Sequence, residues 1–254
     1  MGFPGSVLLN QGDIYKETSD KRYPLGTRGY TRDGRVFHYA RNSSTALALP
    51  GSLLQMAVPT KSGNYSFDLA INAVPTSNST SILITGGSTG SVAADFFNDG
   101  YLFTNDGTGQ GQLVQVKDHG ALTSGATAQA IYLHEEDKIT MTITTATVCG
   151  LVPNIYDGVI IKPATAPTGA VVGVNPIKVT GSYYFWCQTA GPCPVTATGA
   201  LVFAKPVVCS TSGAGSCAAM TTATALTIAQ PVGTAISLGQ GAGDCGLVLL
   251  QIAP

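Results

Sequence analysis

Residues 22–42 read RYPLGTRGYTRDGRVFHYARN, and their pattern predicts a β-hairpin. Two strand-like runs, 29–32 and 35–40, flank the dipeptide Asp33-Gly34. An Asp-Gly pair between two such runs favours a tight turn, because glycine reaches positive φ without a steric penalty. This is the strongest short-range structural signal in the chain.

The same stretch is basic and aromatic. It holds five of the thirteen lysines and arginines and four of the eighteen phenylalanines and tyrosines. Residues 1–41 carry seven Lys and Arg against four Asp and Glu, a net charge of +3. Arg35, Phe37 and Tyr39 share one face of the second run, since successive side chains of a strand point to opposite sides. We therefore expect an extended N-terminal arm that contacts other proteins through Arg28, Arg32, Arg35, Phe37, Tyr39 and Arg41.

The composition beyond this stretch predicts a β-rich body. A chain of 254 residues can bury a core in one large β-domain or in two smaller ones. Charged residues make up only 11%, against a usual value of about 25%. Gly, Ser, Thr, Ala and Val take their place, and they suit strands and tight turns. A surface with so little charge is expected to be covered in part by other subunits or partners.

Short strand-like runs separated by Gly, Pro and Asn follow one another along the chain. This spacing is typical of a sandwich, a jelly roll or a partly open barrel. The predicted organisation is an arm over 1–41, a β-rich domain over 42–162 and a cysteine-containing β-rich domain over 170–254. Residues 163–169, PATAPTG, have the composition of a linker. The two β-rich segments could equally form one continuous body.

Charge and hydropathy exclude several classes of partner. The net charge is −1, so no bulk attraction to nucleic acid is expected. No apolar run approaches the roughly 20 residues that a membrane helix needs. The amino end, MGFPGSVLLNQGD, lacks the cationic start and long apolar core of a signal peptide. We expect a soluble protein made in a cytosol.

All six cysteines lie in the last 106 residues of the chain. Cys187 and Cys193 bracket QTAGP, a turn-like sequence, and Cys209 and Cys217 bracket STSGAGS. Each pair could close a hairpin with a disulfide, and reduced buried thiols are the equal alternative. Neither spacing matches a zinc knuckle, and no histidine follows His134. No metal or cofactor is predicted.

One motif raises the question of an enzyme. Residues 86–90, GGSTG, match the G-x-S-x-G pattern of serine hydrolases, with Ser88 as the nucleophile. That motif needs a turn from a parallel strand into a helix, and the chain lacks an alternating βα pattern. A Gly/Ser turn between strands is favoured, and the hydrolase stays a remote alternative. The acidic corner over 135–137 is interpreted as an exposed turn rather than a cation site.

Three segments carry a resemblance to a known class. PLGTRGYTRDGRVFHYARN (24–42), NDGYLFTNDGTGQGQLVQVKDHGA (98–121) and SYYFWCQTAGPCPV (182–195) resemble virion structural proteins of tailed bacteriophages. The likeness is greatest to small capsid decoration, or cement, proteins, in which a similar Asp-Gly-Arg and aromatic run precedes a β-rich body. It touches the beginning, middle and end of the chain.

The resemblance implies a non-enzymatic protein that binds the outer surface of the capsid, often as a homotrimer, and stabilises the shell. Its implied partners are the major capsid protein and other copies of itself. Its implied location is the virion, after synthesis in the host cytoplasm. A place in a tail, fibre or neck is the structural alternative.

Overall fold

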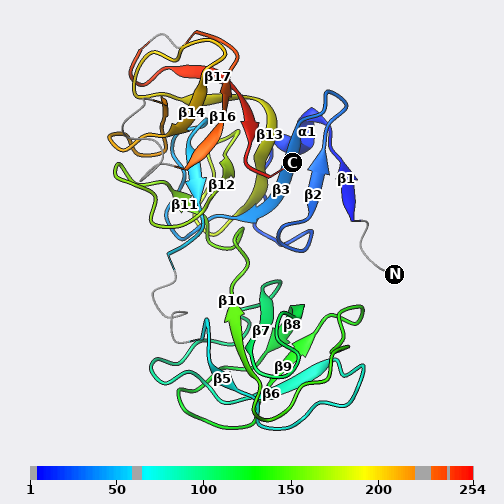
Figure 1. Ribbon diagram of the computed structural model, residues 1–254. Coiled ribbons are helices and arrows are strands. Elements are labelled where there is room, and N and C mark those ends of the chain that lie inside the picture. Colours follow the sequence, from blue (N-terminus) through cyan, green and yellow to red (C-terminus); the bar gives the residue numbers. More distant parts are fainter. Residues whose placement is uncertain (1–4, 59–64, 221–229, 239–240, 254) are drawn as a thin grey trace. The chain divides into compact units, whose positions relative to one another are not determined.

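The computed structural model describes residues 5–58, 65–220, 230–238 and 241–253. The fold is mainly β, with 40% of residues in strands and 2% in helices, and one sheet is nearly closed into a barrel. The predicted fold class is thereby confirmed. The chain forms two compact units: unit 1 comprises Met1–Val58 and Ile155–Pro254, and unit 2 comprises Pro59–Asn154 (Figure 1).

The division into units differs from the predicted one. Unit 2 is inserted into unit 1, between strand β4 (Leu53–Gln55) and strand β11 (Ile160–Ile161). These two strands pair antiparallel, and β4 also pairs with β12 (Val171–Val174), so the partner strands described for β4 come from the segment that follows the insertion. The predicted boundary at 163–169 therefore lies inside unit 1, within a loop.

Unit 1 contains an eleven-stranded sheet with the order β1-β2-β3-β13-β17-β16-β14-β15, to which β4, β11 and β12 are attached through β13. Its remaining elements are β1 (Ser6–Leu8), α1 (Gln11–Ile14), β2 (Arg28–Tyr30), β3 (Val36–Arg41), β12 (Val171–Val174), β13 (Tyr184–Thr196), β14 (Pro206–Cys209), β15 (Cys217–Ala219), β16 (Pro231–Ala235) and β17 (Cys245–Gln251).

The longest strand, β13, joins the two halves of this sheet. Its first half pairs antiparallel with β3, and its second half pairs antiparallel with β17. The sequence QTAGP was predicted to be a turn, but these residues continue the strand. A bulge between Gln188 and Ala190, together with a φ of +85° at Gly191, bends the strand and lets it change partner without reversing direction.

The predicted β-hairpin over residues 29–40 is confirmed. β2 and β3 pair antiparallel, with Arg28 opposite His38 and Tyr30 opposite Val36. The turn is closed by the Thr31 N–H, which donates to the Arg35 carbonyl at 3.0 Å, and Gly34 has a φ of +82°. The hairpin is not part of an extended arm, however. β3 lies against β13, so the hairpin is an internal part of the sheet in unit 1.

Unit 2 contains a six-stranded antiparallel sheet with the order β5-β10-β7-β8-β9-β6. Its strands are β5 (Leu69–Ala70), β6 (Ser81–Ile84), β7 (Tyr101–Asp106), β8 (Leu113–His119), β9 (Gln129–Leu133) and β10 (Val148–Val152). Along β6, Ile82 and Ile84 are buried and alternate with partly exposed residues, as expected for a sheet with one face on the core. Tyr65 and Phe97 fill the centre of that core.

Candidate contact surface at the edge of unit 1

The six predicted contact residues divide into buried and accessible groups. Phe37 and Tyr39 are buried, with exposed fractions of 0% and 3%. They form an apolar cluster with Leu9, Leu25 and Trp186, among others. The prediction that these two rings contact a partner is therefore corrected. The aromatic face of β3 packs inward, because burying a ring of this size stabilises the fold by about 1.5–3 kcal/mol.

Hydrogen bonds and ring contacts hold Tyr39 in this cluster. Its hydroxyl accepts a hydrogen bond from the Arg22 N–H at 3.1 Å. Its ring lies 5.1 Å from the Trp186 ring and 5.3 Å from the Tyr23 ring, with edge-to-face geometry in both pairs. Tyr39 thus fixes the segment before β2 to the sheet.

Arg41 also has an internal partner. Its guanidinium forms a bidentate ion pair with Asp157, with Nε–Oδ1 at 2.5 Å and Nη2–Oδ2 at 3.0 Å. The fork-shaped guanidinium suits this planar contact. Arg41 therefore ties the end of β3 to the segment at which the chain returns from unit 2 to unit 1.

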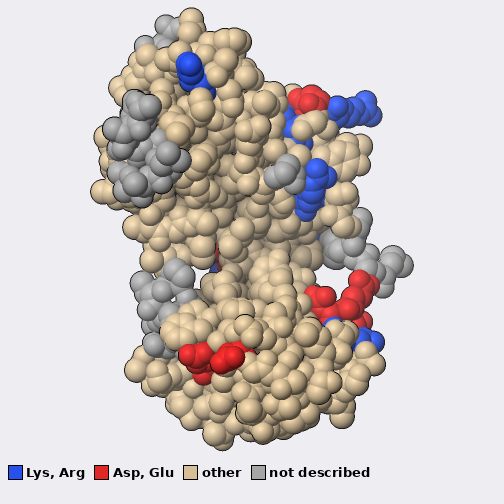
Figure 2. Space-filling model, in the orientation of Figure 1, with Lys and Arg blue, Asp and Glu red and all other residues tan. Residues whose placement is uncertain are grey.

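Arg28, Arg32 and Arg35 remain at the surface. Arg28 and Arg32 are exposed, and Arg35 is partly buried. Arg35 pairs with Asp33 at 2.9 Å, and its guanidinium lies 5.7 Å from the centre of the Phe37 ring. On the face shown in Figure 2, most of the surface carries no charge, and basic side chains of unit 1 gather over α1 and β2.

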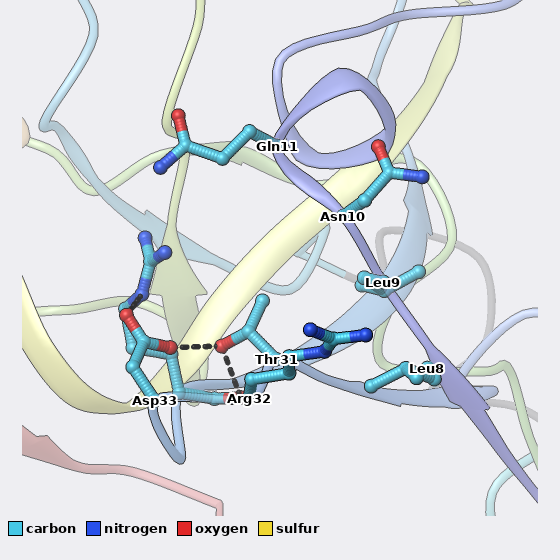
Figure 3. Close-up of a pocket in the computed structure, with 8 residues that line it drawn as sticks. Leu8, Leu9, Asn10, Gln11, Thr31, Arg32 and Asp33 are labelled. Atoms are coloured by element: carbon cyan, nitrogen blue, oxygen red, sulfur yellow. Dashed lines mark hydrogen bonds and ion pairs between the residues drawn. The ribbon is translucent and has the colours of Figure 1, made fainter.

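A pocket of about 500 Å³ lies beside these arginines. Two segments of the chain form it: one joins β1 to α1, and the other is the β2–β3 turn (Figure 3). Figure 3 shows Arg32 extending toward Leu8, with Asp33 on the other side of Thr31. The lining residues are Leu8, Leu9, Asn10, Gln11, Thr31, Arg32, Asp33 and Arg35.

The electrostatics of the pocket leave one arginine charge uncompensated. The Thr31 hydroxyl donates a hydrogen bond to the Asp33 carboxylate, and this bond, with Arg35 beside it, holds the pKa of Asp33 below its usual range. Asp33 is therefore a carboxylate at neutral pH and neutralises Arg35. Within the described part of the chain, Arg32 makes no ion pair, so its charge is available to an anionic partner.

The pocket adjoins an open edge of the sheet. Among the described strands, β1 is terminal in this sheet and pairs with β2 alone, parallel to it. The Leu9 N–H donates to the Tyr30 carbonyl at 2.8 Å, and backbone directions alternate along a strand. The backbone N–H and C=O of Leu8 therefore point away from β2. The Leu8 side chain is 52% exposed, which places apolar surface at this edge.

The sequence did not predict this pocket. β1 is short, and the only signal for it was the apolar run Val7-Leu8-Leu9. The capping box of α1 was not predicted either. The Asn10 side chain accepts from the Asp13 N–H, and the Asp13 carboxylate accepts from the Asn10 N–H. These bonds shape the loop that forms one wall of the pocket.

Ser88 does not occupy a nucleophile elbow. It lies in an irregular loop after the antiparallel strand β6, and no helix follows it in the described part of unit 2. His119, a histidine that follows Ser88 in the chain and could act as its base, is 2% exposed and held at both nitrogens. Nε2 accepts from the Phe97 N–H at 3.0 Å, and Nδ1 donates to the Gly120 carbonyl at 2.6 Å. The hydrolase hypothesis thus lacks the strand–turn–helix arrangement that it requires.

The cysteines are all free thiols in this structure. Cys187 and Cys193 lie on the same strand, β13, and do not close a hairpin. Cys209 and Cys217 lie opposite each other on β14 and β15. Among the described residues, no three His, Cys, Asp or Glu side chains are grouped in a way that could hold a metal ion. In the acidic corner, Glu135 instead pairs with Lys117 at 3.4 Å.

Compared with known proteins, the chain matches no family model, no curated protein and no solved structure. In the part of the chain that the structure describes, no helix has the length and apolar character needed to span a membrane.

Proposed function

We propose that this chain is a non-enzymatic virion structural protein that binds the outer surface of a bacteriophage capsid and stabilises the shell. The resemblance of three segments to capsid decoration proteins supports this, as does a surface with little charge. The observation that carries the proposal is that exposed Arg32, which makes no ion pair with any other described residue, lies beside exposed Leu8 at the β1 edge of the sheet. The partner is then the major capsid protein.

The contact combines three interactions. An extended segment of the partner adds a strand to β1 and gains main-chain hydrogen bonds at the outward-facing groups of Leu8. A carboxylate of that segment accepts bidentate hydrogen bonds from Arg32. Apolar side chains of the partner cover Leu8 and the neighbouring Tyr30, which is 38% exposed. Assembly as a homotrimer would place several such contacts on one particle and convert modest affinity into firm binding.

The test is a single charge reversal, Arg32→Glu. Arg32 is exposed, so the variant is expected to fold as the wild type does. We expect its affinity for capsids that lack surface proteins to fall at least tenfold, measured by co-sedimentation with the intact chain. Deleting residues 1–41 is not a suitable test, because it would remove β3 from beside β13.

The matched control is Lys205→Glu, which reverses an exposed charge elsewhere in unit 1. It is expected to bind like the wild type. Equal binding by wild type and Arg32→Glu would show that this edge is not the contact surface. Failure of the wild type itself to coat capsids, or labelling that locates it in the tail, would overturn the proposed function.

A further inference from the structure

Cys209 and Cys217 face each other at the end of a hairpin. β14 and β15 pair antiparallel, with Val207 opposite Ala219, Val208 opposite Ala218 and Cys209 opposite Cys217. In the described strands, no other two cysteines are paired in this way. Both side chains are buried, with exposed fractions of 1% and 0%.

The hydrogen bonds of the hairpin show which type of cross-strand position Cys209 and Cys217 occupy. The Ser210 N–H donates to the Ser216 carbonyl at 2.9 Å, and the Met220 N–H donates to the Pro206 carbonyl at 3.0 Å. Directly opposed residues of an antiparallel pair alternate between hydrogen-bonded and non-hydrogen-bonded positions. Cys209 and Cys217 therefore occupy a non-hydrogen-bonded position.

At such a position the two Cα atoms are about 4.5 Å apart and the side chains are at their closest. This separation falls within the range of about 4.4–6.8 Å that a disulfide requires. The Cys209 N–H accordingly points away from β15 and donates to the Gln230 carbonyl at 3.0 Å. The backbone is already in place for a bond between the two sulfurs.

The loop that joins the two cysteines is anchored to the rest of unit 1. The Lys162 ammonium donates to the Ser210 carbonyl. The Gly215 N–H donates to the Lys162 carbonyl at 2.8 Å, and the Gly215 carbonyl accepts from the Leu53 N–H at 2.6 Å. These bonds hold the end of the hairpin in one position, so closing the disulfide needs little movement of the backbone.

We propose that Cys209 and Cys217 form a covalent modification site, at which a small-molecule disulfide oxidant closes a cross-strand disulfide. The Cys209 thiolate attacks one sulfur of the oxidant, breaks its S–S bond and releases one thiol. The Cys217 thiolate then attacks the Cys209 sulfur and displaces the second thiol. Two protein thiols are oxidised and the oxidant is reduced to two thiols, whose protons come from the two cysteines.

Two features of the fold favour this order of events. β15 is the last named strand in the order of the sheet, and on its outer side Cys217 is bridged to Ala197, with the Thr198 N–H donating to the Cys217 carbonyl at 3.0 Å. Local opening of the hairpin, with loss of this bridge, admits a small oxidant. Burial raises the pKa of Cys209 to about 11, although the Lys162 charge works against that rise, and burial raises the pKa of Cys217 to about 12. Cys209 is thus the thiol that ionises more readily, and the rate of closure rises with pH.

The test uses the folded, full-length protein with oxidised glutathione, compared at pH 7 and pH 9. Remaining thiols are alkylated in denaturant, and peptic fragments are sequenced by mass spectrometry. We expect four alkylated cysteines and one linked fragment that contains residues 206–220, two hydrogens lighter than its reduced form. The melting temperature of unit 1 should rise after oxidation.

Serine variants identify the pair. Cys209→Ser and Cys217→Ser should each abolish the linked fragment, while Cys193→Ser, which removes another buried thiol of the same core, should retain it. The wild-type fragment map decides the question even if a variant fails to fold. Six alkylated cysteines at both pH values, or a linkage that joins other cysteines, would overturn the proposal.

Discussion

His38 shows how the packing of a single residue sets its chemistry. It lies on β3 opposite Cys187, and its ring stacks on the Tyr156 ring at a distance of 4.9 Å between centres. Its Nδ1 lies 3.0 Å from the Thr189 hydroxyl. Burial, helped by the charge of Arg28, lowers its pKa to about 4. The folded protein therefore keeps His38 neutral across the physiological range.

This depressed pKa predicts that unit 1 loses stability in mild acid. Below its ordinary pKa of 6.5, His38 takes up a proton in the unfolded chain, whereas in the folded chain it does so only near pH 4. The free energy of unfolding should fall between pH 6.5 and 4, by up to about 1.4 kcal/mol per pH unit from this residue. Urea unfolding followed by Trp186 fluorescence measures it.

His38→Gln provides the comparison, because glutamine does not titrate. The carboxylates contribute equally to both proteins, so the difference between the two pH profiles isolates the histidine. If the two profiles run parallel from pH 7 to pH 4, the stated effect of burial on His38 is wrong.

At the scale of elements, the bend of β13 determines how the sheet of unit 1 is assembled. The strand changes partner from β3 to β17 around Gly191. The φ of +85° at this residue lies in the left-handed region, and a Cβ there would lie 3.0 Å from the Arg35 Cα. Glycine is therefore required by both the backbone angle and the close approach of the hairpin.

We expect Gly191→Ala to destabilise unit 1 by about 1–2 kcal/mol, since alanine adds both left-handed strain and a close contact. The control is Gly199→Ala: a Cβ at Gly199 would meet no atom within 4 Å. Thermal unfolding of both variants measures the effect. A Gly191→Ala protein as stable as the wild type would mean that β13 can bend without glycine.

The features that could be predicted from the sequence are those that local interactions specify. The β2–β3 hairpin was predictable, because Asp33 and Gly34 specify its turn within a few residues. The direction in which Phe37 and Tyr39 point was not, because it depends on β13, which lies about 150 residues later in the chain. The pocket was missed for the same reason: β1 pairs with β2 across about 20 residues, and no local pattern specifies a parallel pair.

At the scale of the whole molecule, the main feature is the insertion of unit 2 into unit 1. Unit 1 must bring β4 next to β11 and β12, although about 100 residues of unit 2 separate them. The entropic cost of closing a loop grows only with the logarithm of its length. The insertion of unit 2 therefore adds little to the cost of bringing β4 next to β11 and β12. Composition does not reveal such an insertion, because both units use the same small residues, and so 163–169 was a misleading boundary.

The two units carry different numbers of buried thiols, and this predicts that they respond differently to alkali. Burial raises the pKa of four thiols in unit 1 and of one, Cys149, in unit 2. Above the ordinary thiol pKa of 9.0, the unfolded chain loses these protons while the folded chain keeps them, so stability falls as pH rises. Lys162 acts in the opposite sense, because burial lowers its pKa and unfolding restores a proton below pH 10.5.

Unit 1 should therefore lose stability more steeply than unit 2 between pH 9 and pH 10, because four buried thiols, opposed in part by Lys162, titrate in unit 1 and a single buried thiol titrates in unit 2. Trp186, the chain's one tryptophan, reports the unfolding of unit 1. Hydrogen exchange in β7 and β10, corrected for the intrinsic effect of pH, reports unit 2. Cys193→Ser should reduce the slope for unit 1 alone, since serine does not ionise in this range. Equal slopes for the two units would mean that the thiols of unit 1 are accessible to solvent, which the packing of its core excludes.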